Sequence, residues 1–306
     1  MAKTRINQQK MIYIIISILV VLVESCKQNT STIREIEIQQ TSKDENILAN
    51  CAGSNSETAK LCTVSIVPQF SASRIQTDYW PLLTEIGLRT NICFKLIHQE
   101  SIPLFEKDLK AGKVDYAFMN PYHQVMVKKI YQPIIRDKKR LLKGIIVINK
   151  QNKMSSIEHL DGNILLLPAP NAFAASLLTR AYLNQKNIAF EAKYVKTHQN
   201  VYRGVARNPK YIGGGVNNTF KRESEELKSN LKILFQTKGY PAHPFSANSN
   251  LTPEEIMNVQ SSWLEIAEEP RLRSLFDAIQ IKIPIVADYE RDYAQLTKLG
   301  LEEYVQ

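Results

Sequence analysis

The sequence predicts an α/β protein made of two lobes in tandem. From Cys62 onward, short apolar runs alternate with helix-forming runs, which is the pattern of βαβ units and a parallel sheet. The same alternation starts again at Gly144, and the chain from Pro253 onward is helical in character. Two α/β lobes, with the final segment returning to the first, explain this order best.

The first series of elements begins at residue 62 and ends near residue 130. Pro68 ends the first strand, Gly112 closes the second helix, and Asn120-Pro121 separates the third strand from the third helix. The βαβαβ order favours a parallel sheet with right-handed crossovers. Strands are expected at 62–67, 92–97 and 116–119, and helices at 80–88, 102–111 and 122–130.

The second series begins at residue 144. Ligands of open α/β sheets bind at the carboxyl ends of the strands, and in a two-lobed chain those ends face one another. We therefore expect the binding site in the crevice between the lobes. Strands are expected at 144–149, 164–167, 191–195 and 211–213, and helices at 158–162, 172–185, 199–207, 253–268, 270–278 and 287–299.

The turn after the apolar run 164–167 leads directly into a helix-forming run. A helix start presents unpaired backbone N–H groups and a partial positive charge, so it can hold an anion. The small side chains of Ala172, Ala174 and Ala175 would let a ligand approach the backbone. The alternative is an ordinary strand-to-helix turn in which Asn171 is the N-cap.

The first 25 residues have the pattern of a secretory signal. Basic residues precede the uncharged run 11–23. This run is too short for a membrane-spanning helix, which needs about 20 residues. The next residues resemble a bacterial lipobox, which implies cleavage before Cys26 and a lipid on its thiol; a short uncleaved anchor is the alternative. Residues 26–60 are polar and are expected to form a flexible tether. Either way, the domain would lie outside the cytoplasm, attached to a bacterial membrane.

The chain is basic, with a formal net charge of +9. Removal of residues 1–25 takes away three basic residues and one acidic residue, which leaves +7. A basic balance favours small oxyanions, anionic lipid or nucleic acid as partners. Nucleic acid ranks last for an exported protein, and a solvated basic surface explains most of these charges.

The four cysteines do not have the spacing of a metal site. There is no C-x-x-C pair and no His/Cys cluster in the sequence, so neither zinc nor another metal is expected. With Cys26 lipidated, Cys51 and Cys62 could form a disulfide in an oxidising compartment. Cys93 lies in an apolar strand and is expected to be a small buried side chain.

A series of short motifs follows the order and spacing of a known family: SIVPQ at 65–69, WPL at 80–82, GKVDYA at 112–117, NPY at 120–122, PNAFAAS at 170–176, HQNV at 198–201, GGGVNNTF at 213–220 and PAHP at 241–244. Over about 64–304, the chain is similar to the periplasmic phosphate/phosphite/phosphonate substrate-binding proteins of ABC transporters. The resemblance implies a type II periplasmic binding fold, with one lobe at 61–143 and 240–306, the other at 144–239, and a two-strand hinge. The cleft of such a fold closes on its ligand.

The resemblance also implies a set of ligand-binding residues. Gln69 follows the first strand, Tyr79 would line the pocket, and the phenol of Tyr122 would donate to an oxyanion. His198 stands where the family has a histidine that contacts the oxyanion, and it would donate more strongly when charged. Asn217 stands where an acid or amide meets the polar tail of the ligand. The turn residues Asn171, Ala172, Phe173, Ala174 and Ser176 complete the set, whereas His243 is expected to be structural.

The turn departs from the best-known phosphonate binders, which carry a Ser-Thr-Ser run there. Ala172, Phe173 and Ala174 keep the backbone N–H groups but supply no hydroxyls. Each charge-assisted hydrogen bond contributes about 1.5–3 kcal/mol, so losing two or three would lower the affinity by several decades. Either other donors compensate or the ligand differs, and Phe173 favours a partly apolar or ring-bearing ligand.

The leading interpretation is a monomeric, lipid-anchored periplasmic protein that delivers a small anionic ligand to the permease of an ABC importer. A ligand-sensing module for a membrane signalling partner would use the same fold. An enzyme is not expected, because the sequence has no G-x-S-x-G, Walker A or H-E-x-x-H motif, and no cofactor is expected. A surface lipoprotein that has lost ligand binding and serves as an interaction partner is the remaining alternative.

Overall fold

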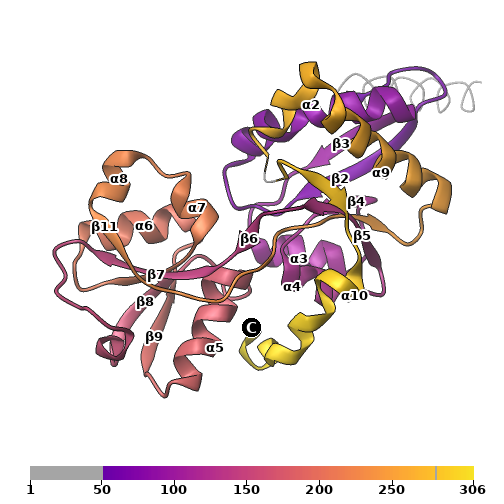
Figure 1. Ribbon diagram of the computed structural model, residues 1–306. Coiled ribbons are helices and arrows are strands. Elements are labelled where there is room, and N and C mark those ends of the chain that lie inside the picture. The colour runs from indigo at the N-terminus through magenta and orange to yellow at the C-terminus, as the bar shows by residue number, and fades with distance from the viewer. Residues whose placement is uncertain (1–50, 280) are drawn as a thin grey trace, which may run out of the picture. The chain divides into compact units, whose positions relative to one another are not determined.

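The computed structural model describes residues 51–279 and 281–306. The predicted signal 1–25, the lipidation site Cys26 and most of the tether therefore lie outside the described residues. Residues 52–306 form one unit, whose strands make two large sheets and one two-stranded ribbon (Figure 1). Each large sheet with its helices is called a lobe below.

The first sheet has seven strands. Strand β2 runs parallel to its neighbours β3 and β4, as the βαβαβ order predicts, whereas the other pairs are antiparallel. β1 belongs to this sheet, although the sequence places its residues in the tether, so the folded part begins before residue 61. In spatial order the strands are β1 (Ala52–Gly53), β3 (Ile92–Ile97), β2 (Lys60–Ile66), β4 (Tyr116–Phe118), β13 (Phe245–Asn248), β5 (Tyr131–Asp137) and β14 (Pro284–Val286).

Helices from both ends of the chain cover the first sheet. In Figure 1, α2 and α9 lie on one face of this sheet, and α3 and α4 lie on the other. A capping box formed by Thr252 and Glu255 starts α9 at the predicted residue. The helical segments are α2 (Ala72–Thr90), α3 (Ile102–Lys110), α4 (Pro121–Met126), α9 (Pro253–Glu268), η3 (Pro270–Phe276), α10 (Tyr289–Asp292), η4 (Ala294–Leu299) and η5 (Leu301–Tyr304).

Helix α2 begins at Ala72, not at residue 80 as predicted. Proline is favourable in the first turn of a helix and costly in its interior. The actual N-cap is Ser71, whose side chain accepts a hydrogen bond from the N–H of Arg74. Pro81 lies inside the helix instead.

The second sheet has five strands, and its strand β7 is buried along its whole length. The continuous apolar run 144–149 is thus a central strand, with β11 and β10 on its two sides. In spatial order the strands are β11 (Leu231–Gln236), β7 (Gly144–Asn149), β10 (Ile212–Val216), β8 (Asn163–Leu167) and β9 (Phe190–Tyr194). The helical segments are η1 (Ile157–Leu160), η2 (Phe173–Leu177), α5 (Leu178–Gln185), α6 (His198–Arg207), α7 (Asn217–Lys221) and α8 (Glu225–Ser229).

Two short strands carry the chain between the lobes. β6 (Leu141–Leu142) leads into the second sheet, β12 (Tyr240–Pro241) leads back, and the two pair antiparallel. The two α/β lobes and the two-strand connection agree with the predicted fold class.

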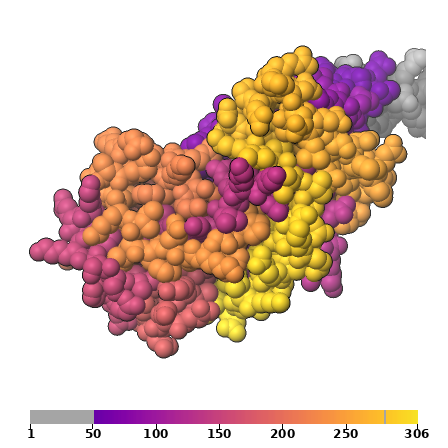
Figure 2. All heavy atoms as spheres, in the orientation of Figure 1, coloured from indigo at the N-terminus to yellow at the C-terminus, as the bar shows by residue number. Residues whose placement is uncertain are grey.

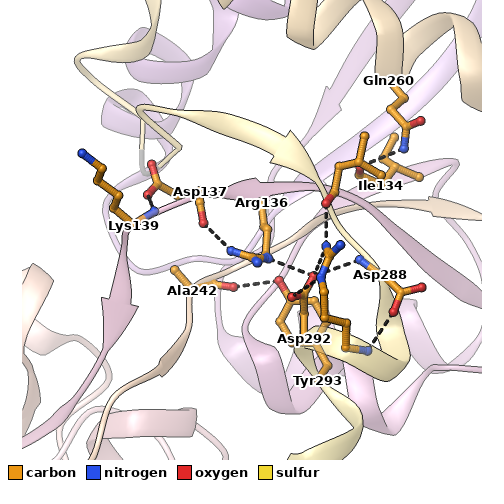
Figure 3. A network of polar contacts seen from close by, with 11 residues as sticks. Ile134, Arg136, Asp137, Lys139, Ala242, Gln260, Asp288, Asp292 and Tyr293 are labelled. Carbon is orange, nitrogen blue, oxygen red and sulfur yellow. Dashed lines mark hydrogen bonds and ion pairs between the residues drawn. The ribbon is translucent and has the colours of Figure 1, made fainter.

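A network of polar contacts joins α10 and its neighbours to β5 and to the chain that leaves β12 (Figure 3). The hydroxyl of Tyr293 donates to the buried carbonyl of Ala242 at 3.0 Å. Beside it, the carboxylate of Asp292 lies 2.8 Å from Nε of Arg136 on β5 and 2.7 Å from the guanidinium of Arg291. Burial alone would raise the pKa of Asp292, but hydrogen bonds from the two arginines outweigh it and lower the pKa to about 2. The network therefore ties the last helices to β5 and to the connection between the lobes.

The cysteines differ from the sequence-based expectation. Cys62 is a buried free thiol, so the predicted Cys51–Cys62 disulfide is wrong. Cys51 and Cys93 are both disulfide-bonded. Cys93 is fully buried in β3, as expected, but it is not a simple apolar side chain. Burial raises the pKa of the Cys62 thiol to about 12, which keeps it protonated and unreactive.

Two negative findings apply to residues 51–279 and 281–306. None of the helices described there is both long and apolar enough to cross a membrane. Over the same ranges, no group of three or more His, Cys, Asp or Glu side chains could hold a metal ion.

Candidate functional site

The turn after β8 opens with a single π-helical turn, η2, before α5 begins. Ala172 occupies the N-cap position without a side-chain hydrogen bond, and its carbonyl accepts from the N–H of Ser176 at 2.8 Å. The turn packs tightly on the second sheet, because a Cβ on Gly144 would meet the carbonyl of Ala174, and one on Gly214 would meet that of Ala175. Glycines in β7 and β10 thus allow this close approach.

A small inner cavity lies where this turn faces the first lobe. Its volume is about 10 Å³, which is room for about one water molecule. Of the residues predicted from the sequence, it brings together Gln69, His198 and the turn residues Ala172, Phe173 and Ala174. Asn120 and His243 also line it, and no Lys or Arg does.

His198 is the first residue of α6 and is only 3% exposed. Its Nδ1 is buried and has no hydrogen-bond partner. Burial lowers the pKa of this imidazole to about 4, so it is neutral near pH 7. The sequence allowed donation by a neutral or by a charged ring, and burial leaves the neutral form.

His243 is the residue that sequence reasoning assigned to a structural role. Its Nε2 lies 2.7 Å from Nε2 of Gln69, and an amide N–H can only donate, so the ring proton is on Nδ1. That Nδ1 is buried without a hydrogen-bond partner. The pKa of His243 is lowered well below its usual value, by burial first and then by His123, Arg140 and His198. The pair Gln69–His243 therefore presents a neutral donor. In the sequence, the one signal that could have pointed to His243 as a site residue was its position beside the connection between the lobes.

Phe173 forms part of the apolar wall of the inner cavity. Its ring meets that of Tyr240 edge to face, with centroids 5.9 Å apart. On the other side, His243 stacks on Phe118 at 5.2 Å. A ligand in the inner cavity would thus meet uncharged donors between aromatic surfaces.

Asn171 makes polar contacts within the protein. Its Nδ2 donates to Oε2 of Glu106 at 2.9 Å and to the carbonyl of Gln306 at 3.0 Å, and its Oδ1 accepts from the N–H of Gln306. Nearby, Arg180 of α5 donates to the carbonyls of Pro170 and Tyr304. The chain at 301–306 is thus bonded to the second lobe, and Figure 2 shows its yellow atoms against the red and pink atoms near α5.

Four further predicted residues do not line the inner cavity. Ser176 is fully buried, and its Oγ has no hydrogen-bond partner. Tyr79 packs in the first lobe with its ring 5.4 Å from that of Phe118. Burial, followed by the negative charges of Glu302 and Glu106, raises the pKa of Tyr122.

Asn217 is engaged with the chain that enters the second lobe. Its Oδ1 accepts from the N–H of Lys143 at 3.0 Å, and its Nδ2 donates to the carbonyl of Leu141 at 3.1 Å. Five predicted residues thus lie outside the inner cavity, and their ligand-binding roles remain predictions: Tyr79, Tyr122, Asn171, Ser176 and Asn217.

A buried acid lies directly behind the inner cavity. Oε1 of Glu106 is 3.0 Å from Nε2 of His123, and both side chains are almost fully buried. Burial opposes ionisation of Glu106, but hydrogen bonds from His123 and Asn171 outweigh it, so its pKa is lowered. The amide of Asn120, which caps α4, stands next to this pair and lines the inner cavity.

A second, larger space adjoins the inner cavity, and we call it the outer cavity. It measures about 730 Å³ and shares Gln69 and Ile102 with the inner cavity. The N-cap residues of three helices line it: Ser71 of α2, Ser101 of α3 and Thr197 of α6. Its volume falls in the range of about 300–1,000 Å³ that is typical of small-molecule sites.

Known proteins share this architecture. The family model described as "ABC transporter, phosphonate, periplasmic substrate-binding protein" matches residues 64–293. PhnD1 from Prochlorococcus marinus, in complex with methylphosphonate, is similar with a TM-score of 0.72 at 16% identity, over 80% of this chain and 98% of that one. A binding protein component of an ABC phosphonate transporter from Pseudomonas aeruginosa has a TM-score of 0.72 at 14% identity, over 80% and 87%. XAC2383 from Xanthomonas citri, bound to ATP, has a TM-score of 0.68 at 14% identity, over 81% and 100%.

At these identities the similarity to solved structures concerns the fold. It confirms the predicted type II periplasmic binding fold with two α/β lobes.

Proposed function

Since this chain belongs to the periplasmic substrate-binding proteins of phosphonate ABC transporters, we propose that its own ligand is a small oxyanion held in the inner cavity. Members of this family bind a solute and deliver it to the permease of an ABC importer; they are transport proteins and not enzymes. The ligand class that we propose is a phosphonate or a phosphate-like anion.

One observation carries this proposal: two buried imidazoles with unpartnered Nδ1 atoms, His198 and His243, line the same cavity. A buried polar atom without a partner costs about 1–3 kcal/mol, so it is expected to have a function. With the ring proton of each on Nδ1, the two imidazoles can replace the hydroxyls that the turn 172–174 lacks. An oxyanion between them would accept hydrogen bonds from both lobes.

Binding in this cavity requires the lobes to move. The inner cavity has room for about one water molecule, so a ligand must enter while the lobes are apart and be enclosed as they close. The free energy of closure comes from contacts that the ligand makes better in the closed state than in the open one.

A partly apolar ligand is a second candidate, and Phe173 favours it. The sequence resemblance implies a hydroxyl-bearing residue at position 173, whereas the ring of Phe173 lines the inner cavity and lies against Tyr240. An arylphosphonate or another ring-bearing anion would gain apolar contact there.

The attachment to the membrane is part of the same proposal. The family is periplasmic, and the lipobox-like residues ending in Cys26 support a lipid anchor at the start of the mature chain. Mass spectrometry of the protein extracted from its native membrane tests this, because the N-terminal peptide should begin at Cys26 and carry acyl chains. A Cys26→Ser variant should be released into the soluble fraction.

A panel of ligands tests the proposed oxyanion site. Thermal shift and calorimetry would compare phosphate, phosphite, methylphosphonate, phenylphosphonate and methanesulfonate. A ligand at 100 times its dissociation constant stabilises the folded state by about 2.7 kcal/mol. His198→Gln should weaken the ligand that binds best, whereas His159→Gln, at an exposed histidine of η1, should not. If none of the oxyanions stabilises the protein, the proposed ligand class is wrong.

A further inference from the structure

We propose that the outer cavity is a second ligand subsite, in which Lys196 binds a carboxylate on the tail of the ligand. This inference rests on the proposed oxyanion function of the inner cavity. The ligand would then be a phosphonocarboxylate or a similar two-headed anion, not a simple alkylphosphonate.

The two cavities are neighbours. Gln69 and Ile102 line both, so only these side chains need to move for a single extended molecule to occupy the two. The inner cavity has room for about one water molecule before the lobes part, whereas about 730 Å³ is open beside it. A tail leaving the headgroup site would enter this space.

Lys196 is the cation that the outer cavity offers to a ligand. The other cation in the lining, Arg74, is already engaged: its guanidinium stacks 4.2 Å from the ring centroid of Phe70 and lies 3.6 Å from a carboxylate oxygen of Asp78. Lys196 forms no ion pair with any residue of the described chain. Its ammonium is therefore available.

The backbone of Lys196 has an unusual conformation. Its φ angle is 75°, a value that costs free energy for a residue with a side chain. The flanking hydrogen bonds hold it there, since the carbonyl of Val195 accepts from the N–H of Thr197 at 3.0 Å and from Nδ2 of Asn200 at 2.9 Å. Glycine would fit this position without strain, so a lysine here suggests that its side chain is used.

The acidic residues of the outer cavity help to determine whether the tail of the ligand is negatively or positively charged. Glu223 is half-buried, its pKa is raised by burial, and it hydrogen-bonds Gln199 near Arg203 and Arg74. Glu100 is exposed and forms no ion pair with a described residue. Because the carboxylate of Glu100 could bind a cation, a ligand with an ammonium tail is the competing possibility. The basic balance of the whole chain and the strained position of Lys196 favour the carboxylate.

Calorimetry with three probes tests the subsite: methylphosphonate, 3-phosphonopropionate and 2-aminoethylphosphonate. We expect the wild-type protein to bind 3-phosphonopropionate about tenfold more tightly than methylphosphonate. Lys196→Gln should remove this advantage and leave the affinity for methylphosphonate unchanged. Lys193→Gln, an exposed lysine on β9 outside the outer cavity, is the matched control and should change neither affinity.

A Lys196→Gly variant separates a binding role from a structural one. Because glycine tolerates the positive φ angle, this variant should melt at an equal or higher temperature and still lose the preference for the carboxylate. If methylphosphonate binds but all three probes bind alike, or the amine binds best, the subsite is refuted while the oxyanion site stands. If no probe binds the wild-type protein, the proposed function fails and this inference falls with it.

Discussion

The two histidines of the inner cavity are polar residues kept neutral by burial. For His198 the pKa is about 4 in the folded protein, against an ordinary value of 6.5. A neutral imidazole in a dry cavity can donate a hydrogen bond without the cost of burying a charge. An anion that enters this site would change that balance, because a negative charge nearby favours the protonated ring.

The stability of the protein should therefore fall as the pH drops from about 6.5 to about 4. In this window the unfolded chain binds a proton at position 198 and the folded chain does not, so protonation favours unfolding, by up to about 1.4 kcal/mol per pH unit for each such histidine. Urea unfolding at pH 7.5, 5.5 and 4.5 measures this. His198→Gln should show a flatter dependence than wild type and than His159→Gln. An unchanged slope in His198→Gln would contradict the buried neutral state.

Single residues were predictable where their position in the chain decided their role. Gln69 and His198 each follow the carboxyl end of a strand, and both line the inner cavity as expected. Asn171 also follows a strand, but its amide bonds to Glu106 and Gln306. The direction of a side chain depends on neighbours from distant parts of the chain, which motif spacing does not contain. For the same reason motif spacing did not show that His243, expected to be structural, lines the inner cavity.

The element that forms the turn of the inner cavity is supported by glycines in two strands. A Cβ on Gly144 would collide with the backbone carbonyl of Ala174, which cannot move without shifting the turn. The site is thus sensitive to residues that do not contact a ligand.

Gly144→Ala should destabilise the protein by about 1–3 kcal/mol through overpacking, and it should weaken oxyanion binding because the turn 172–174 is displaced. Gly204→Ala on α6 is the control. Its Cβ would meet only the end of the Leu166 side chain, and alanine favours the helix, so stability should hold or rise. Chemical unfolding and calorimetry on both variants check this. Equal effects in the two variants would argue against a specific role of the turn.

The polar network at α10 leads to a second prediction, which concerns the stability of the folded protein (Figure 3). Asp292→Asn leaves Arg136 without its carboxylate and should cost about 1–3 kcal/mol at pH 7, a value reduced from that of a fully buried pair because both arginines are partly exposed. Since the pKa of Asp292 is lowered from 3.8 to about 2, its stabilisation is present above pH 3.8 and is lost as the pH falls toward 2.

Acid titration of unfolding tests this element. The stability of Asp292→Asn should approach that of wild type near pH 2.5, whereas the exposed Glu290→Gln should track wild type at every pH. If Asp292→Asn keeps its full deficit at low pH, the loss has another cause.

Elements that a local signal marks were predicted more accurately than strands defined by long-range pairing. β3, α3, β7 and α9 lie within one residue of their expected ranges because an apolar run or a cap marks each of them. β5 contains Pro133, and β13 is a four-residue strand, Phe245–Asn248, with polar residues among its members. β13 lies between β4 and β5, so their places in the first sheet depend on pairing between residues far apart in the sequence. Local patterns do not carry that information.

At the scale of the whole molecule, contacts between the lobes set how readily the protein closes on a ligand. Asn171 and Arg180 of the second lobe bond to Glu106, Tyr304 and Gln306 of the first. On another side, Arg222 lies 3.0 Å from a carboxylate oxygen of Asp78 on α2, donates to the carbonyl of Ala278, and stacks 4.6 Å from the ring centroid of Phe70. Any such contact that breaks when the lobes separate stabilises the closed state selectively.

Arg222→Ala should therefore weaken ligand binding although Arg222 lies outside the inner cavity. The ion pair is largely buried, with side chains 21% and 14% exposed, so its loss should cost about 1 kcal/mol of closure, or about fivefold in affinity. Most of the change should appear as faster dissociation, because the open state that first meets the ligand is unaffected. Stopped-flow displacement measures this, and Lys221→Ala, at the exposed neighbour, is the control. If dissociation is unchanged in Arg222→Ala, the contact persists when the lobes open and takes no part in closure.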